Sequence, residues 1–212
     1  MAELADALAW GVSARKGLGV QLPSRTRLIF YGYQYNPQVG ISAEHLIRNI
    51  PDFPKPGILF KDITPLLADP KMFKQCCQMI SDLATDTDYI AGIEARGFIF
   101  AAAVATMTNK GFIPIRKSGK LPGETISKSY DLEYGQATLE IHAKLIPAGK
   151  KVLIVDDVLA TGGTAVAATD LIIAAPLIPT SLVFLLEIPS LGGRSRIKQA
   201  HSGLKIQTIL AE

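Results

Sequence analysis

Cysteine is almost absent from this sequence: there are two among 212 residues, and they are neighbours, Cys76 and Cys77. Adjacent cysteines on a helix point in different directions, so a disulfide framework is excluded. The sequence also lacks the spacing of cysteine and histidine that is typical of a metal site. Both absences favour a reducing, cytoplasmic location.

Long apolar runs and an excess of one charge are missing as well. The most apolar stretch, residues 171–188, is interrupted by Pro176 and Pro179 and cannot span a membrane. The first eleven residues carry Glu3 and Asp6, whereas a secretory signal would begin with basic residues. The net charge is only +3 at pH 7, which is too weak to indicate a nucleic-acid or membrane partner. What the sequence does have is 48% apolar residues, enough to bury a sizeable core.

Residues 1–40 differ from the rest because they show no sustained helical or strand periodicity. Four of the 22 basic and two of the 19 acidic residues lie there, so the remainder is almost neutral. The opening MAELADALAWGVSARKGLGVQLPSR resembles conceptual translations that run through a transfer-RNA gene. We therefore expect residues 1–40 to be an unstructured or spurious extension and the natural start to lie near residues 39–45. A disordered natural extension is the alternative.

From residue 41 onward, apolar segments alternate with helical patterns. This alternation predicts an α/β fold with a parallel twisted sheet and helices on both faces. Strands are expected at 89–94, 112–116, 151–157 and 182–188, and helices at 42–50, 70–84, 97–109 and 163–175. Asp69 is the expected N-cap of the second helix, with Pro70 as its first residue. Residues 118–146 alternate in polarity, which predicts a small antiparallel hairpin, or hood, standing on the sheet.

The most informative segment is VLIVDDVLATGGT, residues 152–164. A buried strand brings Asp156 and Asp157 to its carboxyl end, where open α/β sheets bind ligands. The loop that follows enters a helix, and its glycines and the helix N-terminus suit a phosphate. The loop residues are Ala160, Thr161, Gly162, Gly163 and Thr164. Because carboxylates repel a phosphate but accept hydrogen bonds from sugar hydroxyls, the combination predicts a ribose 5-phosphate. The Gly-Lys-Ser/Thr ending of a nucleoside-triphosphate loop is absent.

This segment resembles the signature of the phosphoribosyltransferases, and four other segments are similar to the adenine branch of that family. These are PDFPKPGILFKDIT (51–64), GIEARGF (92–98), RKSGKLPG (116–123) and SYDLEYG (129–135). The resemblance covers residues 41–212 and implies the type I phosphoribosyltransferase fold. It also implies transfer of 5-phosphoribose from 5-phosphoribosyl 1-diphosphate to adenine, giving AMP and pyrophosphate in purine salvage.

The resemblance assigns roles to individual residues. It implies that Glu133 handles the proton of adenine as general base and that Arg96 is the second catalytic residue. The implied contacts to phosphoribosyl diphosphate come from the acid pair, the loop 160–164, Arg96, Arg116, Lys117 and Lys120. The implied adenine contacts are Leu59, Phe60, Lys61 and Val158, where Lys61 replaces the arginine that relatives frequently have. A cis peptide is expected between Glu94 and Ala95, and residues 118–133 are expected to form a lid over the substrates.

Magnesium and a second subunit are implied too. A diphosphate leaving group calls for a hard cation, so we expect Mg²⁺ to be held mainly by substrate oxygens with Asp156 and Asp157 nearby. No metal site made by protein alone is expected, since His45, His142 and His201 have no ligand spacing. The family pattern implies a homodimer in which some of the loop cations reach across the interface.

Two alternatives remain open from sequence. One is a phosphoribosyltransferase for another purine base, such as guanine or xanthine; residues 58–61 and Glu133 argue against it. The other is a non-enzymatic regulator that senses phosphoribosyl diphosphate with the same fold. Such a regulator needs a DNA-reading module, and residues 1–40 contain no helix-turn-helix pattern.

Overall fold

The computed structural model describes residues 43–132 and 135–210. The centre of these residues is a seven-stranded sheet in the order β5-β6-β4-β3-β7-β8-β9. Its strands are β3 (Tyr89–Ile93), β4 (Gly111–Lys117), β5 (Thr125–Leu132), β6 (Gly135–His142), β7 (Lys151–Leu159), β8 (Ile178–Glu187) and β9 (Lys205–Thr208). All neighbours from β4 to β9 in this order run parallel, while β6 pairs antiparallel with both β4 and β5. The expected α/β fold is confirmed, whereas the proposed N-terminal extension lies outside the described residues.

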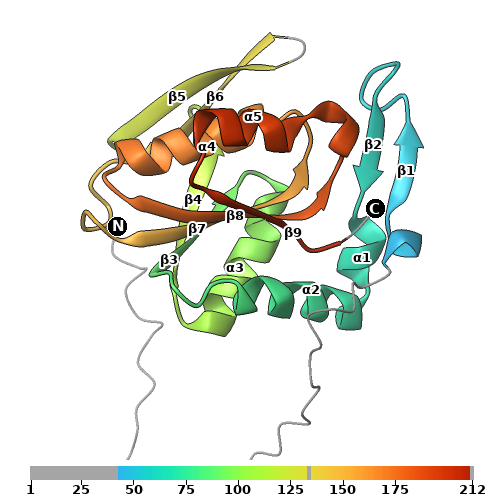
Figure 1. The fold of residues 1–212 in the computed structure, drawn as a ribbon, viewed down its shortest axis with the longest axis horizontal. Helices are drawn as coiled ribbons and strands as arrows, with labels where there is room; N and C mark the ends of the chain where they lie inside the picture. Colours follow the sequence, from blue (N-terminus) through green and yellow to red (C-terminus); the bar gives the residue numbers. More distant parts are fainter. Residues whose placement is uncertain (1–42, 133–134, 211–212) are drawn as a thin grey trace, which may run out of the picture. The chain divides into compact units, whose positions relative to one another are not determined.

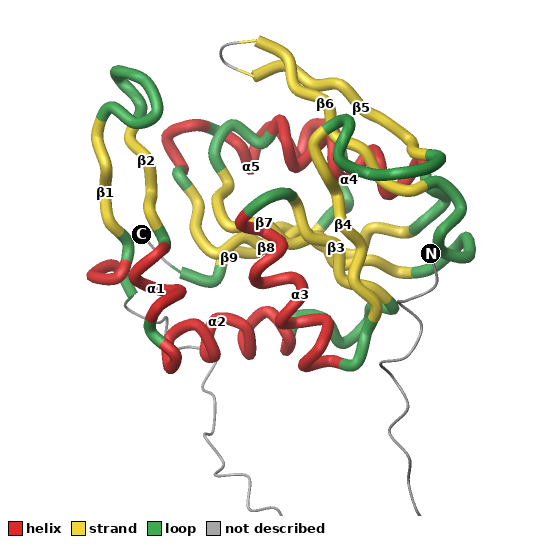
Figure 2. The backbone as a smooth tube through the Cα atoms, turned by 180° about the vertical axis from the view of Figure 1, so that it is seen from behind, coloured by secondary structure: helices red, strands yellow, loops and turns green. Residues whose placement is uncertain are grey.

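Helices cover both faces of the sheet, as Figures 1 and 2 show from opposite sides. The helices are α1 (Thr64–Ala68), α2 (Pro70–Asp82), α3 (Arg96–Thr108), α4 (Gly163–Ala174) and α5 (Gly193–Ala200), with 3₁₀ turns at Glu44–Leu46 and Pro189–Leu191. In both views α2 and α3 lie below the sheet and α4 and α5 lie above it. None of the helices in 43–132 and 135–210 is long and apolar enough to cross a membrane.

The alternation of side chains along β7 produces a separate core on each face. Leu153 and Val155 are fully buried in the cluster that includes α2 and α3. Val152 and Ile154 are fully buried in the other cluster, which includes α4 and α5. A continuous apolar strand is therefore required at this position, and it places the carboxyl end of β7 rigidly between the two helical layers.

Helix α2 begins as its sequence predicts. The side chain of Asp69 accepts hydrogen bonds from the backbone N–H groups of Lys71 and Met72, both at 2.9 Å, and Pro70 is the first helical residue. Cys76 and Cys77 on this helix are buried, unbridged thiols. Burial raises the pKa of Cys76 to about 12 and that of Cys77 to about 11, so both thiols stay protonated at neutral pH.

The structure corrects the expected helix at residues 42–50. Only one 3₁₀ turn forms there, and strand β1 (Arg48–Pro51) follows it and pairs antiparallel with β2 (Leu59–Asp62) in a separate two-stranded sheet. The guanidinium of Arg48 bonds the Asp62 carboxylate opposite it at 2.5 and 2.9 Å. This cross-strand pairing involves a partner fourteen residues away, which local helical spacing does not reveal.

The hairpin of β5 and β6 is confirmed, but it continues the sheet instead of standing on it. Residues Arg116 and Lys117 of β4 pair with Glu140 and Leu139 of β6. Beyond these two pairs the hairpin extends across the α4 side of the sheet (Figure 1). Strand β8 also begins four residues before its expected start, with a register shift where it pairs with Val152 and Leu153 of β7.

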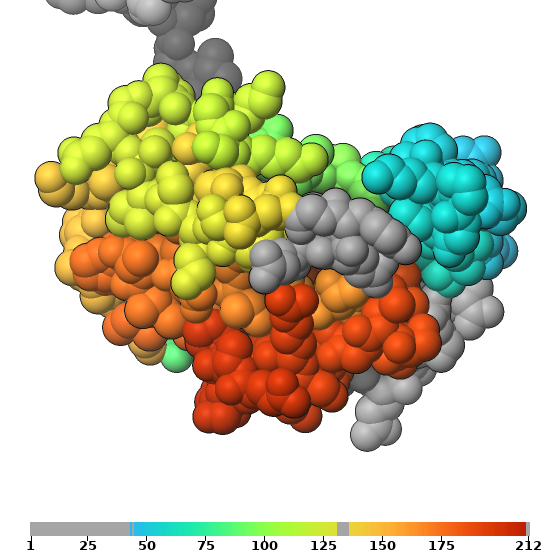
Figure 3. All heavy atoms as spheres, turned by 90° about the horizontal axis from the view of Figure 1, so that it is seen from above, coloured from blue at the N-terminus to red at the C-terminus, as the bar shows by residue number. Residues whose placement is uncertain are grey.

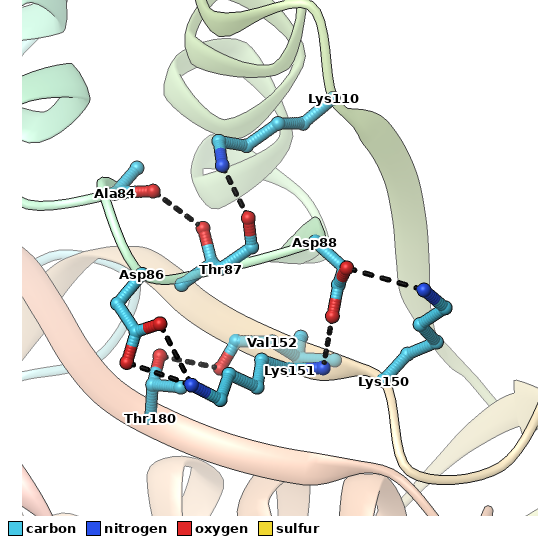
Figure 4. A network of polar contacts seen from close by, with 9 residues as sticks. All are labelled: Ala84, Asp86, Thr87, Asp88, Lys110, Lys150, Lys151, Val152 and Thr180. Carbon is cyan, nitrogen blue, oxygen red and sulfur yellow. Dashed lines mark hydrogen bonds and ion pairs between the residues drawn. The ribbon is translucent and has the colours of Figure 1, made fainter.

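Charged residues fix the amino-terminal end of β7 to the turn before β3 (Figure 4). The carboxylate of Asp88 accepts hydrogen bonds from the backbone N–H of Lys151 at 2.8 Å and from Nζ of Lys150 at 3.3 Å. Nζ of Lys151 bonds both oxygens of Asp86, at 2.7 and 2.9 Å, and Lys110 bonds the carbonyl of Thr87. These contacts hold the strand at the end opposite to its acid pair.

Candidate active site

The connections from β3 and β7 leave the sheet in opposite directions. From β3 the chain passes through α3 to β4 on one side, and from β7 it passes through α4 to β8 on the other. In open α/β sheets such a switch point is where ligands bind. Figure 3 shows the β1–β2 hairpin (cyan) to the right of the β5–β6 hairpin (yellow) on this face of the molecule.

The acid pair lies within β7, two residues before its end at Leu159. Oδ1 of Asp156 accepts a hydrogen bond from the backbone N–H of Asp157 at 2.9 Å, and Asp157 is only 6% exposed. Burial and the neighbouring Asp157 charge raise the pKa of Asp156 well above its ordinary value. Burial also raises the pKa of Asp157, although the Arg96 guanidinium opposes this shift. Holding two ionised carboxylates here therefore destabilises the free protein.

The raised pKa values of the acid pair predict that replacing Asp156 by a neutral residue increases the thermal stability of the protein. A carboxyl whose pKa is higher in the folded state than in the unfolded state binds more protons when the protein is folded. The free energy of unfolding therefore falls as the pH rises from about 4, the pKa of an unfolded aspartate, to the higher pKa of the folded state. Asp156→Asn removes this cost, so we expect its Tm at pH 7 to exceed the wild-type Tm by a few degrees. The difference should shrink as pH falls toward 4.

Asp88→Asn is the matched control for this experiment. Hydrogen bonds from the Lys151 backbone and from Lys150 lower the pKa of Asp88, so its ionised form stabilises the fold above pH 4. Asp88→Asn should therefore lower Tm at pH 7. Thermal unfolding followed by circular dichroism at several pH values measures both variants, and a lower Tm for Asp156→Asn at pH 7 would contradict the assigned pKa direction.

Arg96, the first residue of α3, connects three parts of the site. Its Nη2 lies 2.7 Å from Oδ2 of Asp157, and its Nη1 donates to the carbonyl of Lys61 at 2.9 Å. The guanidinium carbon lies 4.7 Å from the centre of the Phe60 ring, which is a cation–π distance. Asp157 and the segment Phe60–Lys61 were both expected at the site, and Arg96 brings them together. The cis peptide between Glu94 and Ala95 is confirmed.

The residues expected to bind adenine surround this contact. Phe60 also packs edge-on against Phe53, with ring centres 5.1 Å apart. Leu59 is 51% exposed, and Val158 of β7 is partly buried against the core that includes α2 and α3. The exposed Leu59 and the Phe60 ring thus form an apolar surface on which a planar heterocycle can stack.

The loop 160–164 turns sharply into α4. Gly162 adopts φ 78°, and its carbonyl accepts the Val166 N–H at 3.0 Å. On the other side of the loop, Gly193 of α5 is in direct contact with it: a Cβ on Gly193 would lie 2.1 Å from the Ala160 carbonyl oxygen and 3.0 Å from the Gly162 nitrogen. Only glycine permits this approach, so Gly193 fixes the position of the loop.

The expected cations Arg116, Lys117 and Lys120 are organised by two glutamates. Glu94 accepts from Nε and Nη2 of Arg116 at 3.2 and 3.0 Å and from the Lys117 N–H at 3.0 Å. Hydrogen bonds from Arg116 lower the pKa of Glu94. The Lys120 carbonyl accepts from Nη1 of Arg116 at 2.8 Å, and its N–H donates to Glu140 at 3.0 Å. Three of the five N–H donors of Arg116 are used in this way.

Some residues of the site escaped sequence reasoning. Glu94 and Glu140 position the cation loop, Gly193 supports the phosphate loop, and Tyr130 of β5 contacts Thr164. The adjacent glycines 192 and 193 are the one local signal that indicates a close approach; the others depend on strand pairing. Glu133 lies outside the described residues.

The acid pair fits a magnesium ion that is bound mostly by substrate. Among residues 43–132 and 135–210, no cluster of three or more histidine, cysteine or acidic side chains is arranged to hold a metal. Oδ2 of Asp157 is buried and, within the described residues, its 2.7 Å ion pair with Arg96 lacks hydrogen-bond geometry. One or two carboxylates together with substrate oxygens are the donor set that Mg²⁺ commonly uses.

Known proteins match this chain over the same region. A family model described as a phosphoribosyl transferase domain matches residues 62–176. An adenine phosphoribosyltransferase from Thermobifida fusca is 53% identical over 161 residues, covering 75% of this chain and 92% of the relative.

Solved structures agree. The crystal structure of adenine phosphoribosyltransferase from Thermoanaerobacter pseudethanolicus is 46% identical, with a TM-score of 0.73 over 79% of this chain and 96% of that one. The enzyme from Giardia lamblia, complexed with 9-deazaadenine, is 35% identical, with a TM-score of 0.75 over 80% and 96%. Identity, coverage and fold agree, and this chain belongs to the adenine phosphoribosyltransferases of the phosphoribosyl transferase domain family.

Proposed function

We propose that this chain transfers the 5-phosphoribosyl group from 5-phosphoribosyl 1-diphosphate to adenine, forming AMP and pyrophosphate in purine salvage. The observation that carries the proposal is the contact of Arg96 with both Asp157 and the Phe60–Lys61 segment. This contact joins the two segments proposed to bind the ribose and the base, which supports the proposal. Similarity to enzymes that bear this name supports the same reaction.

Different groups of residues bind the phosphate, the ribose, the base and the diphosphate. The N–H groups and hydroxyls of residues 160–164 bind the 5-phosphate at the start of α4, and Asp156 and Asp157 accept hydrogen bonds from the ribose hydroxyls. Adenine lies against Phe60, with Leu59 and Val158 beside it and Lys61 at its edge. Arg96, Arg116, Lys117 and Lys120 bind the diphosphate. For Arg116, two N–H donors beyond those bonded to Glu94 and Lys120 are available for this.

The reaction is a substitution at C1 of the ribose. A ring nitrogen of adenine forms the new C–N bond, the C–O bond to the diphosphate breaks, and pyrophosphate leaves with the bonding electrons. The proton of the adenine nitrogen passes to Glu133. Mg²⁺ held on substrate oxygens near Asp156 and Asp157 would neutralise charge on the leaving group.

Glu133 is tested by Glu133→Ala, which should lower kcat by one to several orders of magnitude because the base is lost. Asp86→Asn is the control, since the Asp86 side chain is 82% exposed and pairs with Lys151 at the end of β7 opposite to the acid pair, and its kcat should stay within about twofold. Steady-state rates of AMP formation measure both. Wild-type turnover in Glu133→Ala would refute the role of Glu133.

The choice of base distinguishes the main function from its alternatives. With phosphoribosyl diphosphate and Mg²⁺ present, we expect turnover of adenine and little turnover of guanine, hypoxanthine or xanthine in a competition assay. A mismatched base edge leaves buried polar groups unpaired, and this can discriminate strongly. Turnover of guanine in preference to adenine would overturn the proposal, and binding without any turnover would favour a regulator.

We also propose that residues 41–212 form the catalytic domain and that residues 118–133 close over the substrates. The extent of the domain is supported by the Thermobifida relative, 92% of which is matched by 161 residues of this chain.

We further propose that the protein works as a homodimer in the cytosol. Two free, buried thiols suit a reducing compartment. Exposed apolar side chains on α3, Ile99 and Met107, suit coverage by a second copy.

A further inference from the structure

Strand β5 faces α4 through alternate side chains. Nζ of Lys128 pairs with Asp170 of α4 at 2.8 Å, and two residues further along the strand the Tyr130 hydroxyl meets Oγ1 of Thr164 at 3.2 Å. Ser129, between them, bonds Thr138 of β6 at 2.8 Å instead. Lys128 and Tyr130 therefore point toward α4, and the Ser129 hydroxyl is directed to the neighbouring strand.

The Tyr130 side chain is held in place by its ring. The ring packs against the buried cluster that includes α4 and α5, so its hydroxyl is presented at a fixed point. That point is the side chain of Thr164, which belongs to the first turn of α4 and to the loop 160–164. An aromatic side chain with few rotatable bonds places a donor here at low entropic cost.

The hydroxyls of Thr164 and Tyr130 carry one proton each, and only one of these protons is used in the contact between them. Thr164 donates to the Tyr130 oxygen, and the proton of Tyr130 meets no acceptor within the described part of the chain. A phosphate that takes the Thr164 proton in place of the Tyr130 oxygen lies within reach of the Tyr130 hydroxyl as well, because the two oxygens are 3.2 Å apart. A charged acceptor makes such a hydrogen bond stronger than a neutral one does.

We propose that Tyr130 is an additional ligand of the 5-phosphate, supplied by the hairpin to complete the loop 160–164. The inference rests on the proposed function of that loop. It assigns to β5 a direct contact with the ribose phosphate and no contact with the diphosphate.

The test is calorimetric titration of the full-length protein with ribose 5-phosphate and, separately, with pyrophosphate and Mg²⁺. Tyr130→Phe removes only the hydroxyl and keeps the ring packing. We expect it to weaken ribose 5-phosphate binding about tenfold, the size of one hydrogen bond to a charged group, and to leave pyrophosphate binding and Tm unchanged. In steady-state assays KM for phosphoribosyl diphosphate should rise and KM for adenine should not.

Thr138→Val is the matched control, since it removes the hydroxyl of β6 that contacts Ser129, away from Thr164 and outside residues 118–133, and it should bind both ligands as the wild type does. Equal ribose 5-phosphate affinity in Tyr130→Phe and wild type would overturn the inference and leave the proposed function intact. Equal weakening of both ligands would also overturn it, by revealing a general effect on the hairpin. Failure of the wild type to bind ribose 5-phosphate would refute the proposed loop function itself.

Discussion

Arg96→Lys should lower kcat/KM by about 100- to 1,000-fold. The guanidinium contacts Asp157, the Lys61 carbonyl and the Phe60 ring at once, and a single ammonium group cannot reproduce this planar arrangement. A hydrogen bond to a charged group contributes about 1.5–3 kcal/mol and a cation–π contact about 0.5–2 kcal/mol, and each 1.4 kcal/mol lost in the transition state lowers the rate about tenfold. Because Arg96 is also an expected diphosphate ligand, both kcat and KM should change.

The control for Arg96 is Arg48→Lys. Arg48 also pairs with an aspartate, but its side chain is 61% exposed on β1, and exposed ion pairs contribute about 0–1 kcal/mol. Its kcat/KM should stay within about threefold of the wild type in assays of AMP formation. If Arg96→Lys retained a third or more of the activity, Arg96 would not be the residue that joins the ribose and base positions.

Gly193→Ala should lower kcat/KM for phosphoribosyl diphosphate by about 100-fold, although residue 193 is expected to touch no substrate. Its new Cβ would lie 2.1 Å from the Ala160 carbonyl oxygen, so the phosphate loop or α5 must move by about an ångström. A displacement of that size in a binding loop is enough to cost about two orders of magnitude. The effect should appear mainly in KM for phosphoribosyl diphosphate and in the affinity for ribose 5-phosphate.

Gly203→Ala provides the comparison. A Cβ on Gly203 would have no atom of the described residues within 4 Å apart from its chain neighbours, so this variant introduces the same methyl group into open space and should keep wild-type kinetics. Circular dichroism at 25 °C confirms that each variant is folded. A wild-type KM in Gly193→Ala would show that the loop accommodates the methyl group and that its position is not fixed by α5.

The parts of the fold that could be predicted from sequence are those specified locally. The continuous apolar run of β7, the glycines before α4 and the Asp69 cap of α2 each contain their own structural reason, and each is confirmed. The strand β1 could not be predicted, because residues 48–51 become a strand only by pairing with residues 59–62.

The site shows the same division. The segments that gather at the switch point were identified from sequence, because each carries an unusual local pattern of acids, glycines or cations. The contacts between these segments could not be identified from the sequence. Glu94 bonded to Arg116, Tyr130 on Thr164 and Gly193 against Ala160 each join residues that lie 22 to 34 positions apart. Such contacts are set by how strands and helices pack, which one sequence does not record.

Adenine-dependent release of pyrophosphate from 5-phosphoribosyl 1-diphosphate tests the central claim most directly. With the wild-type protein and Mg²⁺, pyrophosphate and AMP should form in equal amounts, and neither should form when adenine is omitted. Release of pyrophosphate without AMP, or no release at saturating adenine, would contradict the assignment of this sheet edge as the site of phosphoribosyl transfer.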